Sequence, residues 1–217
     1  MRPLSELLNA EDPGIQKIRE WVGGAVNQCV LLPPSADREH VLLQTQVTTR
    51  STLGAIAYET GGVMVDGGWL RFLGSGHPKL TRTLPAWNEG RSNGSYLVAD
   101  DAVGGFFAIN GGALGQDAGN MYYWAPDSLD WEPMKIGFTD FFVWTLSDRL
   151  AQFYESLRWP SWREDTATLS GDNCFGFYPF LWTREGSITT SRRAPLPVQE
   201  AYDMKVDVVR QLNQRSP

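Results

Sequence analysis

Apolar positions change their spacing twice along this 217-residue chain, and each change predicts a different secondary structure. Up to about residue 62 they recur three or four positions apart, which is typical of amphipathic helices. From there to about residue 136 they alternate with polar positions or form short runs, which is typical of strands. After residue 138 the helical spacing returns. The pattern predicts an α+β protein whose helices precede and follow a block of strands.

Cap and turn residues mark the ends of the first elements. Asp12, which precedes a proline, is expected to cap a helix that the glycine pair at 23–24 ends. Ser51 is expected to cap another helix, which ends at the glycines at 61–62. Between these helices the pattern predicts a strand over 27–34 and a helix over 36–46.

The central block carries the signals of a sheet built from hairpins. Asp66-Gly67 lies between two alternating runs and predicts a tight turn. Pro133 places the last strand of the block at a sheet edge, because proline cannot donate a main-chain hydrogen bond. After a polar loop over 74–94 with one helical turn, the predicted strands are 95–100, 104–110, 120–126 and 129–136.

The C-terminal third is predicted to be mainly helical. Thr139 is expected to cap a helix, and the apolar stripe over 150–157 predicts a second one. The segment 173–183 is interpreted as a strand or an extended aromatic segment, and a last helix is expected over 198–212. Neither a repeat nor a linker interrupts the pattern, which predicts a single domain over 1–217.

The stretch LVADDAVGGFFAINGG (97–112) has the glycine content of a phosphate-binding loop. Such a loop needs G-x-G-x-x-G between a strand and a helix, or Gly-Lys-Ser/Thr after four spacer residues. Neither spacing occurs there, and no helix is predicted to follow. We therefore expect these glycines to form hairpin turns, and no cofactor is predicted.

The charge balance limits the classes of partner. Acidic residues outnumber basic ones by 25 to 19, and the resulting net charge of −6 argues against nucleic-acid binding. An acidic surface is compatible with a basic protein partner. The sequence shows neither a signal peptide nor an apolar run that would span a membrane, so a cytoplasmic location without membrane association is expected.

Few residues invite a catalytic interpretation. Asp100 and Asp101 lie at a strand-to-turn junction, where aspartate usually bonds nearby main-chain amides. His77, in a glycine-rich loop, could join them in the pocket of a hydrolase or a small-molecule binding protein. Cys174 has no nucleophile motif around it, and two histidines in unlike contexts do not form a zinc site. No catalytic residue and no metal site is predicted.

Tryptophan is the remaining signal, because the chain has nine of them and several lie in predicted turns or at strand ends. Tryptophan near the surface is typical of a protein-recognition patch. The residues predicted to contact a partner are Trp69, His77, Asp100, Asp101, Trp124 and Trp131.

Six stretches jointly identify the chain as a member of an uncharacterised bacterial family, a domain of unknown function. They are TTRSTLGAIAYETGG, GWLRFLGSGHP, LVADDAVGGFFAINGGALG, NMYYWAPDSLDWE, RWPSW and FYPFLWT, which span about residues 48–183. This resemblance implies no known activity.

A second resemblance covers about residues 97–146. The order LVADD, GGFFAING, GNMYYWAPDSLDWE and FTDFFVWTL is similar to the core of the SUKH superfamily, which includes Syd and Smi/Knr. It implies an α+β fold with an antiparallel β-meander wrapped by helices, here a core of about 48–147 with a helical C-terminal extension over 148–217. Many bacterial SUKH proteins are immunity proteins that bind toxins, and the superfamily offers no catalytic residues.

Three functions stay open at this point. The first is a non-enzymatic protein-binding module, such as a toxin-neutralising immunity protein. The second is the hydrolase or ligand-binding protein that would use His77, Asp100 and Asp101. The third is self-association through an exposed tryptophan patch.

Overall fold

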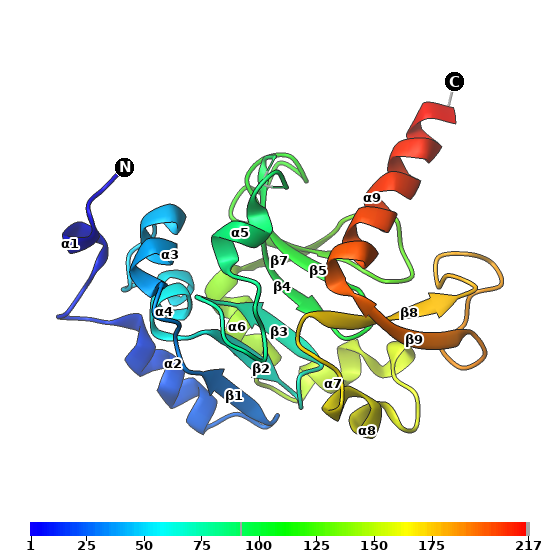
Figure 1. Cartoon of the computed structure of the whole chain (residues 1–217), viewed down its shortest axis with the longest axis horizontal. Coiled ribbons are helices and arrows are strands. Elements are labelled where there is room, and N and C mark those ends of the chain that lie inside the picture. Colours follow the sequence, from blue (N-terminus) through cyan, green and yellow to red (C-terminus); the bar gives the residue numbers. More distant parts are fainter. Residues whose placement is uncertain (92, 216–217) are drawn as a thin grey trace.

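The computed structural model describes residues 1–91 and 93–215. Its main feature is one sheet in which every strand pairs antiparallel with its neighbours in the sequence (Figure 1). The predicted α+β class and antiparallel meander are confirmed. The strands are β1 (Cys29–Leu32), β2 (Gly62–Val65), β3 (Leu70–Leu73), β4 (Ser95–Asp101), β5 (Phe106–Asn110), β6 (Asn120–Trp124) and β7 (Glu132–Gly137).

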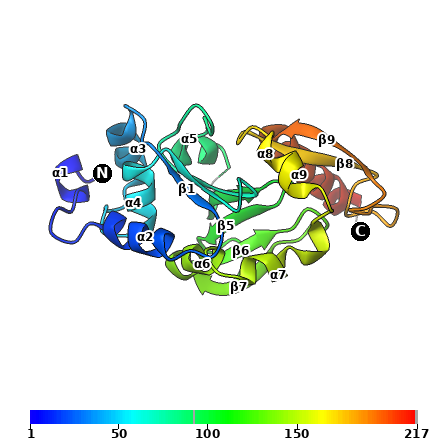
Figure 2. The same cartoon turned by 90° about the horizontal axis from the view of Figure 1, so that it is seen from below.

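Helices cover both faces of this sheet (Figure 2). Adjacent residues of β5 show the two sides: the Phe106 ring lies 5.0 Å from that of Tyr202 in α9, whereas Phe107 lies 4.8 Å from Phe141 in α6. The helices are α1 (Leu4–Leu7), α2 (Gly14–Gly23), α3 (Arg38–Thr45), α4 (Thr52–Glu59), α5 (Leu84–Asn88), α6 (Phe138–Thr145), α7 (Arg149–Phe153), α8 (Trp162–Ala167) and α9 (Val198–Arg215).

The C-terminal extension contains strands as well as helices. The strand predicted within 173–183 is confirmed as β8 (Asn173–Tyr178), whereas its partner β9 (Arg192–Pro197) was not expected and corrects the helical extension; the two form a separate ribbon that precedes α9. The sequence RRAPLP did not indicate a strand because of its two prolines, yet a ribbon with two outer edges tolerates proline. The amide of Phe175 donates to the carbonyl of Ala102 at 2.7 Å, which attaches the ribbon to the β4–β5 turn.

Two predicted helix caps are wrong. Asp12 does not cap α2, which begins at Gly14, and it forms ion pairs at the surface instead. Thr139 lies inside α6, whose cap residue is Gly137. Ser51 does cap α4, accepting a hydrogen bond from the amide three residues later. A side chain caps a helix only if its residue takes the N-cap position, and tertiary contacts decide at which residue each helix begins.

The glycines of 97–112 form turns, as predicted. β4 and β5 pair directly, and the chain reverses at Gly104, whose φ of 82° favours glycine. The Asp66-Gly67 hairpin is also confirmed, with β2 and β3 paired on either side of it. β5 leads to another strand and not to a helix, so the segment lacks the architecture of a phosphate-binding loop.

Phe72 of β3 lies at the centre of the core, fully buried against Phe138, Phe141 and Phe142. Replacing it by alanine is expected to lower the free energy of unfolding by about 3–5 kcal/mol, because the change leaves a cavity between sheet and helices. Urea denaturation measures the change. Val143→Ala, on the outer side of α6, is the control and should stay within about 0.5 kcal/mol. Equal losses would contradict this packing.

Candidate functional site

Two adjacent carboxylates are buried at the end of β4. Asp100 and Asp101 are both 0 % exposed. Adjacent strand residues point to opposite faces, so the two carboxylates lie on opposite sides of the sheet. A buried carboxylate is costly unless its oxygens are paired or accept hydrogen bonds, and each of these has a complete set of partners.

Asp100 forms part of a chain of alternating charges. It lies directly opposite Arg71 of β3, whose Nε and Nη2 both donate to its Oδ1. Its other oxygen accepts from Arg82 Nη1 at 2.6 Å, and Arg82 Nε lies 3.1 Å from Asp172. Burial lowers the pKa of Arg82, but these two carboxylates outweigh that effect and raise the net pKa. The network joins two strands to the loop that precedes β8.

Asp101 holds the β4–β5 turn. Its Oδ1 accepts from the amides of Val103 and Gly105 at 3.0 and 2.7 Å. Its Oδ2 accepts from the hydroxyls of Tyr123 and Tyr154 at 2.7 and 3.0 Å. Burial raises the pKa of Asp101, and the hydrogen bonds from Gly105, Tyr123 and Tyr154 together with the charge of Arg71 reduce that rise without reversing it. A Cβ atom at position 105 would collide with this carboxylate, which explains the glycine there.

The structure does not assemble the predicted hydrolase site. His77 Nδ1 accepts from the amide of Lys79 at 3.1 Å, inside a tight turn. Over the described part of the chain, no hydrogen bond or ion pair joins His77 to Asp100 or Asp101. Because the partners of both carboxylates are complete, neither is available as a general base. The alternative function gains no support.

The tryptophans do not form an exposed patch. Each of the nine is buried or half-buried, which corrects that expectation. Trp69 packs against Tyr154 and two other tryptophans, and Trp124 lies 5.2 Å from the half-buried Trp131. Contact of the six predicted residues with a partner stays a prediction. Trp69, Trp124 and the two aspartates are buried and present no surface to one in this conformation.

Other reactive groups are also held inside the fold. Burial raises the pKa of Cys29 and of Cys174 to about 12, so both are thiols at neutral pH. Residues 1–91 and 93–215 contain no group of three or more metal-ligating side chains. Among the same residues, no helix combines the length and apolar character needed to cross a bilayer.

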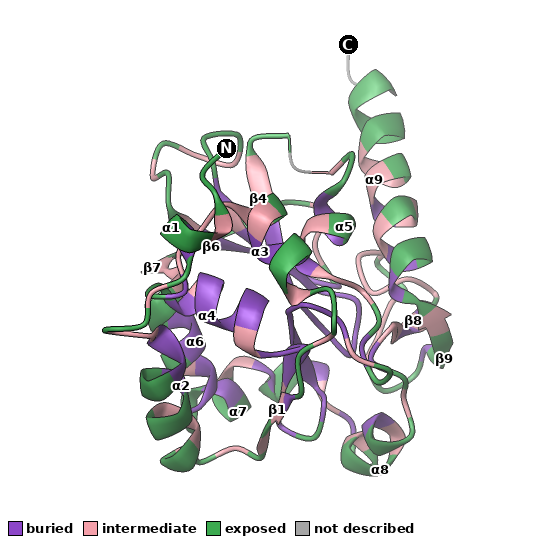
Figure 3. Ribbon diagram, turned by 60° about the vertical axis from the view of Figure 1, so that its left-hand side comes forward, coloured by how far each residue is buried: buried purple, intermediate pink, exposed green. Residues whose placement is uncertain are grey.

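The two edges of the large sheet differ. β7 carries Pro133 and a bulge in which Lys135 has a φ of 59°, and such features protect an edge from further pairing. β1, at the opposite edge, has the apolar sequence CVLL (Figure 3). Its Val30 is 44 % exposed. The β1 edge has neither a bulge nor a charged side chain, and its protection consists of its short length and the two prolines that follow it.

The outer side of β1 has unused main-chain groups. The carbonyl of Gln28, just before β1, accepts from the amide of Asp66, just after β2. Such pairs alternate along a strand, so the main-chain N–H and C=O groups of Cys29 and Leu31 point away from β2. Within the described residues, no loop or side chain bonds these two amides. Beside the edge lies a groove of about 570 Å³, lined by Val30 and Met64 among others.

Lys205 of α9 is a buried amine without a contacting carboxylate among the described residues. Its Nζ donates to the carbonyl of Ala125 at 2.6 Å and lies 4.5 Å from the centre of the Trp124 ring. Burial lowers the pKa of Lys205 to about 7, although Asp101, Asp127 and Cys174 act in the opposite direction. Sequence reasoning missed this residue, because lysine on a polar-faced helix is normally exposed.

The fold and these features define a class: an α+β protein on an antiparallel meander whose buried aspartates are structural. The chain belongs to the family described as Protein of unknown function DUF2625, which it matches over residues 4–201. It is 43 % identical over 209 residues to the uncharacterised protein YbfG of Escherichia coli K12, covering 94 % of this chain and 96 % of YbfG. An uncharacterised protein of Haemophilus influenzae Rd is 38 % identical over 189 residues, covering 83 % of each chain.

Membership of an uncharacterised bacterial family is thus confirmed, and the names of the family and of these relatives assign no activity. The resemblance to the SUKH superfamily stays a prediction.

Asp100→Asn is expected to lower the free energy of unfolding by about 3–5 kcal/mol, because it leaves two buried guanidinium groups without their shared counter-ion. Urea denaturation measures the loss. Asp12→Asn, which removes exposed ion pairs, is the matched control and should cost no more than about 1 kcal/mol. Similar losses for the two variants would show that the network is not structural.

The stability of the protein is expected to rise with pH between about pH 6.5 and about pH 7.5, below the range in which unfolded cysteine, with a pKa of about 8.5, ionises appreciably. Across that window Lys205 loses its proton in the folded protein but keeps it in the unfolded chain. The unfolded state then holds more protons, and the contribution is at most about 1.4 kcal/mol per pH unit. Lys205→Met should fold and flatten this dependence in urea titrations. An unchanged slope would contradict the assignment.

Proposed function

We propose that this protein acts by binding another protein, and that a basic partner adds a β-strand to the free edge of β1. In this role it is a cytoplasmic, toxin-neutralising protein of the immunity type. The observation that carries the proposal is the edge of β1, whose outer amides are unbonded and which lies beside the groove, in contrast to the bulged edge at β7.

Strand addition supplies both affinity and specificity. The outward main-chain groups of Cys29 and Leu31 can bond an extended segment of the partner. Alternate side chains of that segment would enter the groove lined by Val30 and Met64. The two prolines that follow β1 limit the added strand to a short segment.

The net charge of −6 supports a basic partner, because complementary charge accelerates the encounter of two proteins and selects against acidic competitors. The resemblance of residues 97–146 to a superfamily rich in immunity proteins points to a toxin as that partner. The saturated carboxylates and the protonated thiols favour binding over catalysis.

Val30→Lys is expected to weaken partner binding, because it places a charge on the edge and in the groove. Val143→Lys, at a similarly exposed valine (39 %) on α6, is the matched control and should bind normally. Each variant is used to capture proteins from a bacterial lysate, and the captured protein is then purified and its complex measured by calorimetry. The affinity of Val30→Lys should fall at least about ten-fold.

Hydrogen exchange on the purified complex tests the binding mode. The amides of Cys29 and Leu31 should exchange more slowly in the complex, since they gain hydrogen bonds. Protection elsewhere with none at β1, or equal binding by both lysine variants, would overturn the proposal. If the chain forms a dimer that Val30→Lys dissociates, and no other partner is captured, the occupant of the β1 edge is a second copy of this chain and not a toxin.

A further inference from the structure

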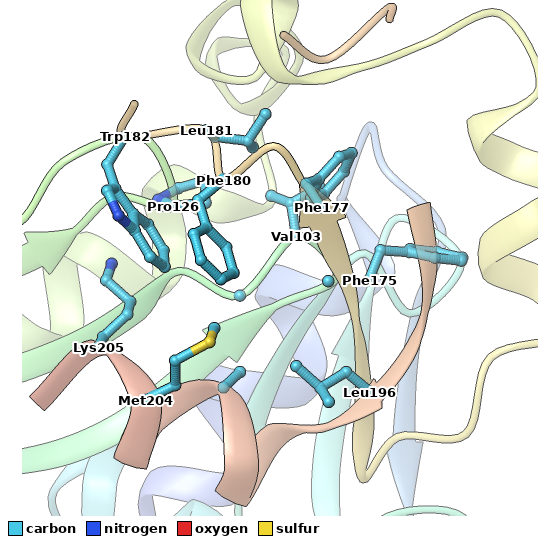
Figure 4. Close-up of a pocket in the computed structure, with 13 residues that line it drawn as sticks. Val103, Pro126, Phe175, Phe177, Phe180, Leu181, Trp182, Leu196, Met204 and Lys205 are labelled. Carbon is cyan, nitrogen blue, oxygen red and sulfur yellow. The ribbon is translucent and has the colours of Figure 1, made fainter. Parts of the chain in front are cut away.

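A narrow cavity lies between the β8–β9 ribbon, α9 and the β4–β5 turn (Figure 4). Its volume is about 30 Å³, which is room for about one water molecule. The walls are mostly apolar side chains, and the polar exception is the amine of Lys205. Among the wall residues are Val103, Phe180, Trp182, Leu196 and Met204.

The amine of Lys205 reaches this cavity from α9. Figure 4 shows its nitrogen at one end of the hollow, beside the ring of Trp182. The side chain is 2 % exposed, and its amine donates to the main-chain carbonyls of Trp124 and Ala125. No carboxylate of the described residues lies within 4 Å of it, although Asp101 and Asp127 act on it from farther away. A cation buried in this way lacks a counter-ion.

One wall of the cavity is a loop with few attachments. Within the described residues, the hydrogen bonds of 180–190 all end inside the β8–β9 loop, for example that from the Ser187 amide to Ser191. Phe180 and Trp182 stack on each other at 4.6 Å and line the cavity together with residues of α9 and the β4–β5 turn. A loop held by side-chain contacts can open at a smaller free-energy cost than a strand.

We propose that this cavity, with its loop displaced, is the binding site of a small carboxylic acid with an apolar body. The carboxylate pairs with Lys205, and the alkyl or aryl body contacts Phe180, Trp182 and Met204. The ligand supplies the counter-ion that the protein does not.

The composition of the site selects this ligand class. One cation balances a single negative charge, whereas a phosphate dianion would need a second cation or several amides. Apolar walls contribute affinity in proportion to the area of ligand that they remove from water. A neutral alcohol of the same length would leave the amine without a counter-ion.

Binding is expected to take up a proton. Because burial lowers the pKa of Lys205 to about 7, the amine of the free protein is mainly neutral at pH 8.5 and must be protonated to pair with a carboxylate. Affinity should therefore fall about ten-fold per pH unit above pH 7.5. This slope separates the site from a surface lysine, which is protonated throughout the range.

Calorimetry with hexanoate at pH 6.5 and pH 8.5 tests the proposal, with hexan-1-ol as the neutral probe. Hexanoate should bind the full chain with the stated pH dependence, and hexan-1-ol at least about ten-fold more weakly. Lys205→Met should lose hexanoate binding at least about ten-fold, whereas the matched exposed variant Lys17→Met should bind normally. Val30→Lys should also bind hexanoate normally. The outcome of this test is therefore independent of the proposed role of the β1 edge.

A labelling experiment covers the case in which Lys205→Met does not fold. Hexanoate should slow reductive methylation of Lys205 in the unaltered protein at least about five-fold, with the site mapped by mass spectrometry. Equal binding of acid and alcohol, binding retained by Lys205→Met, or no protection of Lys205 would overturn the proposal. A peptide with a C-terminal phenylalanine that binds more tightly than hexanoate would overturn the assignment to a free acid.

Discussion

The arrangement of the whole chain depends on burying two adjacent carboxylates at the end of β4. Strand geometry sends Asp100 and Asp101 to opposite faces of the sheet, so each must find its partners in a different layer. Asp100 binds Arg71 and Arg82, and these arginines bind the segment at the start of β8. Asp101 holds the β4–β5 turn and accepts a hydrogen bond from Tyr154, which follows α7. A dipeptide thereby attaches the C-terminal elements to both faces.

This constraint also separates the polar groups that are used to hold the fold from those that can still bind another molecule. The residues that attract attention first, the paired aspartates and the tryptophans, are consumed by packing and hydrogen bonding. Two less conspicuous groups keep a capacity for further bonds: the outer main-chain groups of β1, and the amine of Lys205, which has carbonyl acceptors but no contacting carboxylate. An edge group without a hydrogen bond or a buried amine without a counter-ion is a place where an external partner adds most.

The local elements were largely accessible to sequence reasoning, and the site was not. The hairpin at Asp66-Gly67, the cap at Ser51 and the edge position of β7 each depend on a few neighbouring residues. The partnership of Asp100 with Arg82 joins a strand to a polar loop, and no spacing rule links them. The prediction of which side chains are exposed fails for the same reason. Whether Trp69 is buried depends on Trp162 of α8, which is distant in the sequence.

The sequence by itself determined the α+β class, the order of the strands and the absence of a phosphate-loop spacing, because periodicity and turn chemistry act over a few residues. Only the tertiary structure decided which polar groups are satisfied. It paired Asp100 with two arginines and placed Asp101 in a turn. It also left the outer amides of β1 unbonded and enclosed the amine of Lys205. The physical reason is that desolvation and charge pairing are summed over contacts between residues far apart in the chain.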